Sequence, residues 1–281
     1  MPLLKTPAIT LKSRKWGDAD RLVTFYTLRF GKLRGVARGA RRMKSRFGSA
    51  LEPFVHCDLN LFEKRHDPVY RIMQADILEP FSGLREDLAL MSSAARLVNL
   101  VVAVTAEGDA GPRIFQTLLT GLRSLLESSE PSLTALLFQI RLLGQTGFQP
   151  QTDQCVGCGA GLRSAADAIP TMFSPQAGGV VCAPCTDRYP DRCLRLSPGS
   201  AALLQHALRW SPEILTRLKA TGHVREQLGA AIEAYITVVA GKRLPPVDFL
   251  VAEPAEPAYG IKPELQTNGR DDRNPIRSEA R

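Results

Sequence analysis

Several features that signal catalysis or membrane insertion are missing from this chain of 281 residues. Its four histidines are scattered, without the spacing of a metalloprotease or nuclease, and no G-x4-G-K-[ST] loop is present to hold a nucleotide phosphate. The longest apolar stretch, Leu97 to Ala106, is interrupted by Asn99 and is too short to span a bilayer. The N-terminus has no apolar run of signal-peptide length. We therefore expect a cytoplasmic protein that is not an enzyme and binds neither nucleotide nor membrane.

Acidic residues are also missing from one stretch, Lys32 to Arg46. Residues 1–50 contain 13 Lys and Arg against 2 Asp and Glu, a formal charge of +11, whereas residues 51–281 carry −3. The cations of the acid-free stretch are Lys32, Arg34, Arg38, Arg41, Arg42, Lys44 and Arg46. So concentrated a positive field favours a polyanionic partner, of which nucleic acid is the commonest.

A run of charge is usually a solvated surface loop, and that alternative stays open here. Two further details favour nucleic-acid contact. Gly39 and Gly48 allow the backbone to approach a ligand closely. Lys32, Arg34 and Arg38 share one face of a predicted strand. We therefore predict that strand and loop cations line one groove and contact phosphates.

Aromatic residues make up only 6% of the chain, which limits the candidates for base stacking. Phe47, between Arg46 and Gly48, is one, and Trp16, in a turn beside Lys15, is another. For both, an ordinary structural role is an equal alternative. We expect the strand aromatics to lie in the core: Phe25, Tyr26, Phe54 and Phe62.

Apolar residues alternate with polar ones in the first 80 residues, most clearly from Val55 to Leu61, which is typical of half-buried strands. Turn residues separate the strands, and no helical period is convincing there. Five short strands in so few residues indicate a small barrel. The predicted strands are Ile9–Arg14, Leu22–Thr27, Leu33–Arg38, Val55–Leu61 and Tyr70–Leu78.

After Pro80 the apolar residues recur every three to four positions, which predicts helices. Ser197 and Pro198 form a good N-cap and first-turn pair for one of them, and Gly241 ends the last. The predicted helices span Leu84–Val102, Ile114–Leu126, Leu133–Leu143, Pro198–Leu208 and Val224–Val239. The tail from about residue 253 has little to bury and is expected to be disordered.

Four cysteines form two C-x2-C pairs separated by 23 residues: Cys155, Cys158, Cys182 and Cys185. In a reducing cytosol such pairs indicate metal ligands rather than disulfides. Four thiolates at tetrahedral geometry suit Zn²⁺ and leave no open position, so we predict one structural zinc ion. Free thiols or a redox pair remain the alternative. Cys57 is expected in the core, and Cys193 is either an accidental thiol or a substitute ligand.

The order of these segments resembles the RecO family of bacterial recombination mediators. The resemblance covers about residues 3–250 and depends on an ordered combination of segments rather than on any one of them. The segments that carry it are Gly17–Thr24, Gly31–Arg42, Lys44–Gly48, Leu51–Phe54, Phe138–Leu143 and Gly147–Pro150, leading into Cys155 and Cys158.

The resemblance implies an α+β protein with an N-terminal OB-fold barrel and an α-helical domain that carries a four-cysteine zinc-binding insertion. The implied divisions are 1–80 for the OB-fold, 81–150 and 196–252 for the two parts of the helical domain, 151–195 for the zinc module and 253–281 for the tail.

The resemblance also implies a function: binding single- and double-stranded DNA, annealing complementary strands and, with RecR and in some bacteria RecF, helping RecA to load on strands coated by single-stranded-DNA-binding protein (SSB). The helical domain would hold the acidic, apolar C-terminal tail of SSB, with Arg141 as a candidate anion partner; an ordinary surface arginine of the helix is an equal alternative for Arg141. The protein would then work in the cytoplasm at the nucleoid.

Two other classes stay open from the residues alone. One is a zinc-ribbon adaptor that binds structured RNA or the transcription machinery through its basic end. The other is a zinc-dependent nuclease or deaminase, which would need a His ligand and a neighbouring Glu, and neither C-x2-C pair has an H-x-E partner.

Overall fold

The computed structural model describes residues 3–63, 69–161, 171–189 and 192–245. The predicted tail, 253–281, lies outside these residues. Within them, no helix combines the length and apolarity that crossing a membrane requires. The predicted division at residues 80, 150 and 195 stays a prediction. Contacts within the chain do not separate these parts, because Met1–Val251 forms one compact unit.

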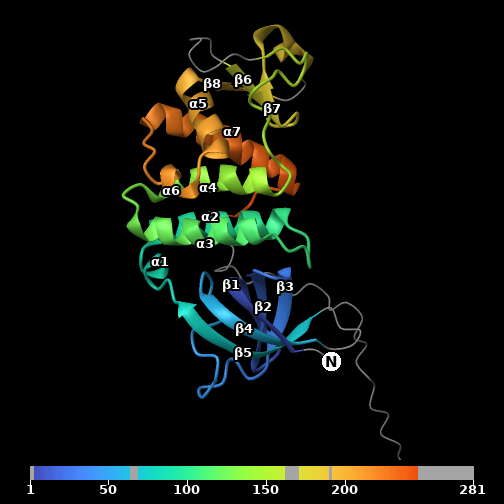
Figure 1. Cartoon of the computed structure of the whole chain (residues 1–281), viewed down its shortest axis with the longest axis vertical. Coiled ribbons are helices and arrows are strands. Elements are labelled where there is room, and N and C mark those ends of the chain that lie inside the picture. Colours follow the sequence, from blue (N-terminus) through green and yellow to red (C-terminus); the bar gives the residue numbers. More distant parts are fainter. Residues whose placement is uncertain (1–2, 64–68, 162–170, 190–191, 246–281) are drawn as a thin grey trace, which may run out of the picture. The chain divides into compact units, whose positions relative to one another are not determined.

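Five strands form a closed barrel at the N-terminal end, as Figure 1 shows. The order around the barrel is β1-β2-β3-β5-β4, with β1 also pairing with β4. All neighbours are antiparallel except β3 and β5. This is the five-stranded barrel of an OB-fold, and it confirms the predicted class. The strands are β1 (Leu3–Trp16), β2 (Asp20–Thr27), β3 (Gly31–Ala37), β4 (His56–Phe62) and β5 (Tyr70–Glu79).

The barrel interior is filled by the alternate apolar residues that predicted the strands. Phe25, Cys57 and Leu59 are completely buried, and the predicted core position of Cys57 is confirmed. Burial raises the pKa of the Cys57 thiol to about 12, so it stays protonated and inert. A second apolar cluster includes Ile9 and Tyr26 of the barrel together with the helices. The barrel therefore packs directly on the helical part.

The first predicted helix is in fact two: α1 (Gly83–Glu86) and α2 (Leu88–Val104). The single helix expected from Leu84 onward is wrong at its start, because the Asp87 backbone is extended (φ −120°, ψ 129°). The Asp87 carboxylate accepts a hydrogen bond from the Leu90 N–H at 2.9 Å and thereby caps α2. Apolar spacing continued through this capping residue and hid the break.

The other predicted helices are confirmed as α3 (Pro112–Glu127), α4 (Pro131–Gln145), α5 (Pro198–Arg209) and α7 (Gly222–Ala240), joined by a short α6 (Pro212–Leu215). Ser197 caps α5 as expected, accepting from the Ser200 N–H at 3.2 Å. Gly241 ends α7 with φ +67°, which a residue with a Cβ rarely adopts. Helix α4 packs between α2, α3 and α5 and carries the longest run of buried residues.

The cysteine-containing segment folds around a small sheet between α4 and α5. Its strands are β6 (Thr171–Ser174), β7 (Gly179–Val181) and β8 (Leu194–Leu196), in the order β7-β6-β8, with a 3-10 turn η1 (Ala183–Arg188). One face of the sheet places Phe173 against Tyr235 of α7, with ring centroids 5.9 Å apart. The opposite face places Met172 and Val181 against the cysteines.

Candidate nucleic-acid interface and metal centre

The segment between β3 and β4, residues 38–55, contains most of the acid-free stretch and starts at the tip of the β1–β2 hairpin. The Arg41 N–H donates to the Ala19 carbonyl at 2.9 Å, and its guanidinium donates to the Asp18 carbonyl at 2.8 Å. The Gly39 N–H donates to Asp20 Oδ1 at 2.7 Å. Gly39 has φ +69°, which explains the glycine at this bend. The first half of the loop is therefore held against the hairpin.

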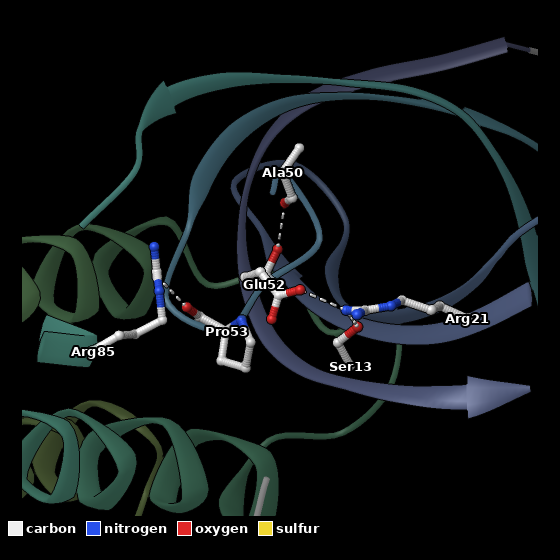
Figure 2. Close-up of polar contacts among 7 residues, drawn as sticks. Ser13, Arg21, Ala50, Glu52, Pro53 and Arg85 are labelled. Carbon is white, nitrogen blue, oxygen red and sulfur yellow. Dashed lines mark hydrogen bonds and ion pairs between the residues drawn. The ribbon is translucent and has the colours of Figure 1, made fainter. Parts of the chain in front are cut away.

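The second half of the loop is fixed to the barrel wall and to α1, as Figure 2 shows. Arg21 of β2 contacts both Ser13 Oγ at 3.2 Å and Glu52 Oε1 at 2.8 Å. From α1, Arg85 donates to the Pro53 carbonyl at 2.9 Å. Because both ends are held, the loop presents its cations from a defined backbone rather than from a loose arm.

Four loop cations are exposed: Arg38, Arg42, Lys44 and Arg46. None of them has an ion pair or a side-chain hydrogen bond with the part of the chain that the structure describes; Arg46 lies over the Phe47 ring at 5.0 Å. Arg41 is exposed too, but its guanidinium donates hydrogen bonds to two carbonyls of the hairpin. The structure thus brings five of the seven predicted residues together on one loop.

Lys32 and Arg34 lie apart from this group, because β3 runs from the helices toward the hairpin. Lys32 Nζ donates to the Val102 carbonyl at 2.7 Å and to the Thr105 carbonyl, at the C-terminus of α2. Burial lowers its pKa, with Glu107 opposing that effect. Arg34 Nε pairs with Glu107 Oε1 at 2.7 Å. Their role as DNA ligands stays a prediction, but both side chains already join the barrel to the helices.

A third contact at this junction joins β4 and β5 of the barrel to α3. Glu79, the last residue of β5, accepts from His56 Nδ1 at 2.9 Å and from Arg123 Nε of α3 at 2.8 Å. The hydrogen bond from Arg123 is the main cause that lowers the Glu79 pKa to about 2, against a smaller opposing effect of burial. The His56 ring meets Phe115 edge-on at 5.8 Å.

The two stacking candidates have different positions. Phe47 is 3% exposed and belongs to the barrel core, so its proposed role in stacking is wrong. Because Phe47 follows a run of basic residues, its sequence neighbours did not indicate that its side chain points into the barrel. Trp16 is 37% exposed at the end of β1 and belongs to no buried cluster. Among the strand aromatics Phe25, Tyr26 and Phe54 are buried as expected, and Phe62 is half-buried.

Two cations beside the loop were missed by sequence reasoning. Arg14 and Lys15 lie just before the end of β1, in the same hairpin that holds the loop, and neither has an ion partner among the described residues. Lys15 is exposed and lies opposite Arg21 across the hairpin. They stand well before the acid-free stretch in sequence, and only the pairing of β1 with β2 and of β2 with β3 brings them to the same end of the barrel as the loop.

The four predicted cysteines come together. Their sulfur atoms all lie within 4.8 Å of one another, and Cys158 Sγ is 3.7 Å from Cys182 Sγ. Four sulfurs around one zinc ion at about 2.3 Å would lie about 3.8 Å apart, so the donor set and its spacing fit that metal. Cys193 is not part of this cluster.

The backbone prepares one of these sulfurs to act as a ligand. Burial alone would raise the pKa of Cys155, but the N–H groups of Cys182, Gly157 and Cys158 outweigh it and lower the pKa to about 6. The Gly157 and Cys182 donors are each 3.3 Å from Cys155 Sγ. A C-x2-C turn aims backbone donors at sulfur in this way and stabilises a thiolate, the form that binds metal.

A cavity of about 600 Å³ opens between α2, α4 and α7. Its lining combines apolar residues, among them Leu136 and Ile236, with the guanidinium of Arg96. That guanidinium has no ion pair or hydrogen bond within the described residues, and burial lowers its pKa, with Glu233 opposing. Arg141, the expected anion partner, instead donates to the Leu208 carbonyl of α5 at 2.6 Å.

Comparison with known families and proteins agrees with this architecture. Residues 1–81 match the family described as recombination protein O, N terminal, and residues 85–246 match recombination protein O, C terminal. The boundary between the two matches falls at the end of the barrel. The match therefore covers both the barrel and the helices with their cysteine module.

Several curated relatives are similar over most of their length, and each is named DNA repair protein RecO. The protein of Heliobacterium modesticaldum is 34% identical over 84% of this chain and 85% of its own. That of Symbiobacterium thermophilum is 34% identical over 89% and 97%, and that of Myxococcus xanthus 34% identical over 86% and 95%. Identity at this level over almost the whole chain indicates a shared fold and family.

Proposed function

The chain belongs to the recombination protein O family of DNA repair proteins, and on that premise we propose that it binds single- and double-stranded DNA and anneals complementary strands. The proposed contacts are the loop cations Arg38, Arg41, Arg42, Lys44 and Arg46. Lys32 and Arg34 are not included, because their side chains contact α2 and the segment after it. Binding of this kind reads backbone charge rather than base sequence.

The observation that carries this proposal is a loop that is hydrogen-bonded to the barrel at both ends and has cations without a carboxylate partner among the described residues. Two DNA strands repel each other through their phosphates, and a cationic surface relieves this by replacing condensed counterions. Cations already neutralised by carboxylates could not do so. None of the five proposed loop residues has a carboxylate partner among the described residues, and Arg41 alone donates to backbone carbonyls. No step of annealing consumes a nucleotide, which agrees with the missing phosphate-binding loop.

We propose further that the protein acts with RecR, and with RecF where a bacterium uses it, to help RecA load on SSB-coated single strands. It would do this as a mediator rather than as an enzyme, in the cytoplasm at the nucleoid. The SSB tail is acidic and apolar, and the cavity is lined by apolar residues, two glutamates and three arginines. Arg225 pairs with Glu130 and Arg243 with Glu233, which leaves Arg96 as the lining arginine without an ion pair among the described residues. We place the tail there rather than at Arg141.

One zinc ion is proposed for the four-cysteine cluster, held by Cys155, Cys158, Cys182 and Cys185. Cysteine thiolates would then fill all four coordination positions of a tetrahedral site. The ion would therefore stabilise the module and leave no position for water or a substrate. Among the described residues, the buried cluster on the cysteine side of this module consists of Cys155, Val181 and Cys185, whereas Phe173, Val180 and Leu196 on the other face of its sheet pack against the helices. Metal binding would therefore supply much of the free energy that holds the two C-x2-C turns together.

The decisive experiment is the annealing of complementary oligonucleotides that have been coated with SSB beforehand. The protein should accelerate annealing without ATP. In a fluorescence-anisotropy titration, about four phosphate contacts would give a slope near −3 for log K against log[salt] on single strands. An annealing rate unchanged by the protein would contradict the proposed activity.

Elemental analysis tests the metal. The unsubstituted protein should contain one zinc per chain, and Cys155→Ser should lose it and melt at a lower temperature. Cys193→Ser is the matched control, because Cys193 lies outside the cluster, and it should keep the zinc. A purified protein without zinc that is equally stable would refute the assignment.

Calorimetry with a peptide of the SSB tail tests the cavity. Arg96→Ala should weaken binding about tenfold or more, because a charge-assisted contact contributes about 1.5–3 kcal/mol. Arg113→Ala, an exposed α3 residue that lines no part of the cavity, should bind as the unsubstituted protein does. Equal heats for both variants would remove Arg96 from the site.

The RNA-adaptor alternative is tested by competition. Single-stranded DNA should displace a labelled DNA oligonucleotide at least as well as structured RNA of equal length. Stronger displacement by the RNA would favour the alternative.

A further inference from the structure

We propose that the β1–β2 hairpin tip and the basic loop form one nucleotide-binding unit, in which Trp16 stacks on an unpaired base and Asp20 is the positioning residue that holds the loop beside it. This inference rests on the proposed DNA binding. It adds a contact that distinguishes single strands from duplexes, which the loop cations alone do not supply.

The hairpin and the loop are joined by four hydrogen bonds within a few residues. Asp20 Oδ1 accepts from the Gly39 N–H at 2.7 Å, and the Ala19 carbonyl accepts from the Arg41 N–H at 2.9 Å. The Arg41 guanidinium adds donors to the carbonyls of Asp18 at 2.8 Å and Gly17 at 3.3 Å. Asp20 is the one side-chain acceptor among these contacts, so the start of the loop depends on its carboxylate.

An acid in this place needs a physical reason. Asp20 lies beside a cationic surface, where its charge opposes the attraction of DNA. Its hydrogen bond supplies that reason, because the Asp20 carboxylate oxygen holds the Gly39 N–H at the bend where the loop begins. The exposed cations of the loop lie on either side of this bend. Arg14 and Lys15 precede Trp16 on the same hairpin. The hydrogen bonds between the hairpin and the loop therefore connect two cationic segments that are far apart in the sequence.

Trp16 is placed as a platform by the same hairpin. It is the last residue of β1 and lies directly opposite Asp20 in the strand register, so both side chains point to one face of the hairpin. The indole has no ring contact and no hydrogen bond with the described residues, and 37% of it is exposed. Base faces are open in a single strand and covered in a duplex, so stacking here favours single strands.

Four variants separate the roles in anisotropy titrations with single- and double-stranded oligonucleotides. Trp16→Ala should weaken single-strand binding between about fivefold and about a hundredfold, with an unchanged salt slope and little effect on duplex. Trp16→Phe keeps a ring and should lose less. Asp20→Ala should weaken binding although it removes a negative charge, whereas Asp20→Asn keeps the acceptor oxygen and should bind at least as well as the unsubstituted protein.

The sign of the Asp20→Ala effect is the sharpest result. If Asp20 acts only through its charge, both Asp20 variants tighten binding and the positioning role is overturned. Circular dichroism and melting temperature establish that the variants fold. If Asp20→Ala does not fold, Asp20→Leu takes its place against Asp20→Asn, because leucine has a similar size and lacks the acceptor oxygen; if Trp16→Ala does not fold, Trp16→Leu takes its place against Trp16→Phe.

Tryptophan fluorescence gives an independent readout. Poly(dT) should quench the unsubstituted protein and leave Trp16→Phe nearly unchanged, because the second tryptophan, Trp210, is stacked on His206 at 4.0 Å in the helical part. DNA binding without quenching, or a Trp16→Ala variant that binds single strands normally, would overturn this inference and leave the proposed function standing. If the unsubstituted protein binds no DNA, both fall together.

Discussion

The two ends of the barrel contain cations from the same stretch of sequence, and their surroundings differ. At the docked end, where β3 begins, Lys32 and Arg34 contact α2 and the segment after it. At the open end, beyond Ala37, the loop cations Arg38 to Arg46 face solvent. The first and last residues of the seven-residue strand β3 are six steps apart, which is about 20 Å at about 3.3 Å per step. A run of like charge in sequence is therefore not one surface in space.

The difference has a physical consequence for mutation. A half-buried ammonium that satisfies helix carbonyls contributes to folding, because its loss leaves acceptors without a donor. An exposed cation without a partner contributes little to folding and remains available for an anion. We therefore expect changes at the docked end to affect stability and changes at the open end to affect DNA affinity.

The largest expected effect comes from reversing charge at the open end. Arg42→Glu combined with Lys44→Glu and Arg46→Glu should lower single-strand affinity at least about a hundredfold and flatten the salt slope by about 2, since three phosphate contacts are lost. The melting temperature should stay nearly constant. Anisotropy titrations at several salt concentrations measure both quantities.

A matched triple variant controls for net charge. Arg217→Glu, Lys219→Glu and Lys242→Glu change the total charge equally, and all three residues are exposed on the helical part. Affinity should fall much less in this variant. Equal losses in the two triple variants would mean that overall charge, not the loop, attracts DNA.

The docked end should respond in the opposite way. Lys32→Met removes the donor to the Val102 and Thr105 carbonyls and should cost about 2 kcal/mol of unfolding free energy, with an unchanged salt slope. Lys44→Met should change stability by less than about 0.5 kcal/mol. Urea denaturation compares the pair. A Lys32→Met protein of normal stability but flatter salt dependence would return Lys32 to the DNA surface.

A smaller effect is expected from the ion pair between α3 and the barrel. Arg123→Ala removes both hydrogen bonds to Glu79 and, as a partly exposed pair, should cost about 1 kcal/mol or less. Arg113→Ala lies on the same helix without a partner in the described residues and should cost almost nothing. Similar urea midpoints for the two variants would show that the junction does not depend on this pair.

The smallest effect is the pH dependence of that pair. The Glu79 pKa is about 2 when folded and near 4.5 when unfolded, so the unfolded state takes up the proton first as pH falls. The stabilisation is complete above about pH 5 and is lost progressively toward pH 2. Melting curves should show the gap between the unsubstituted protein and Arg123→Ala narrowing over this range. A constant gap would assign the stabilisation to contacts other than the ionised carboxylate.

Much of the fold could be predicted from local patterns. Alternation in Val55–Leu61 identified a strand of the barrel, Ser197 with Pro198 located the start of α5, and the two C-x2-C pairs identified the four clustered cysteines. Each of these signals depends on neighbouring residues, and neighbours share the same local geometry. The break between α1 and α2 was missed because the cap at Asp87 leaves the apolar spacing unchanged. At Phe47 the sequence left stacking and a structural role equally open, and burial in the barrel decided for the structural role.

By itself, the sequence determined the kind of elements, the excess of positive charge at one end of the chain and the four cysteines that could hold a metal, because composition and short-range spacing encode these. Only the tertiary structure decided which cations are available. Lys32 meets Val102 seventy residues later, and Lys15 pairs with Arg21, which in turn pairs with Ala37 just before the loop. Contacts between distant residues set burial and ion pairing, and these determine whether a charge stabilises the fold or remains available for a ligand.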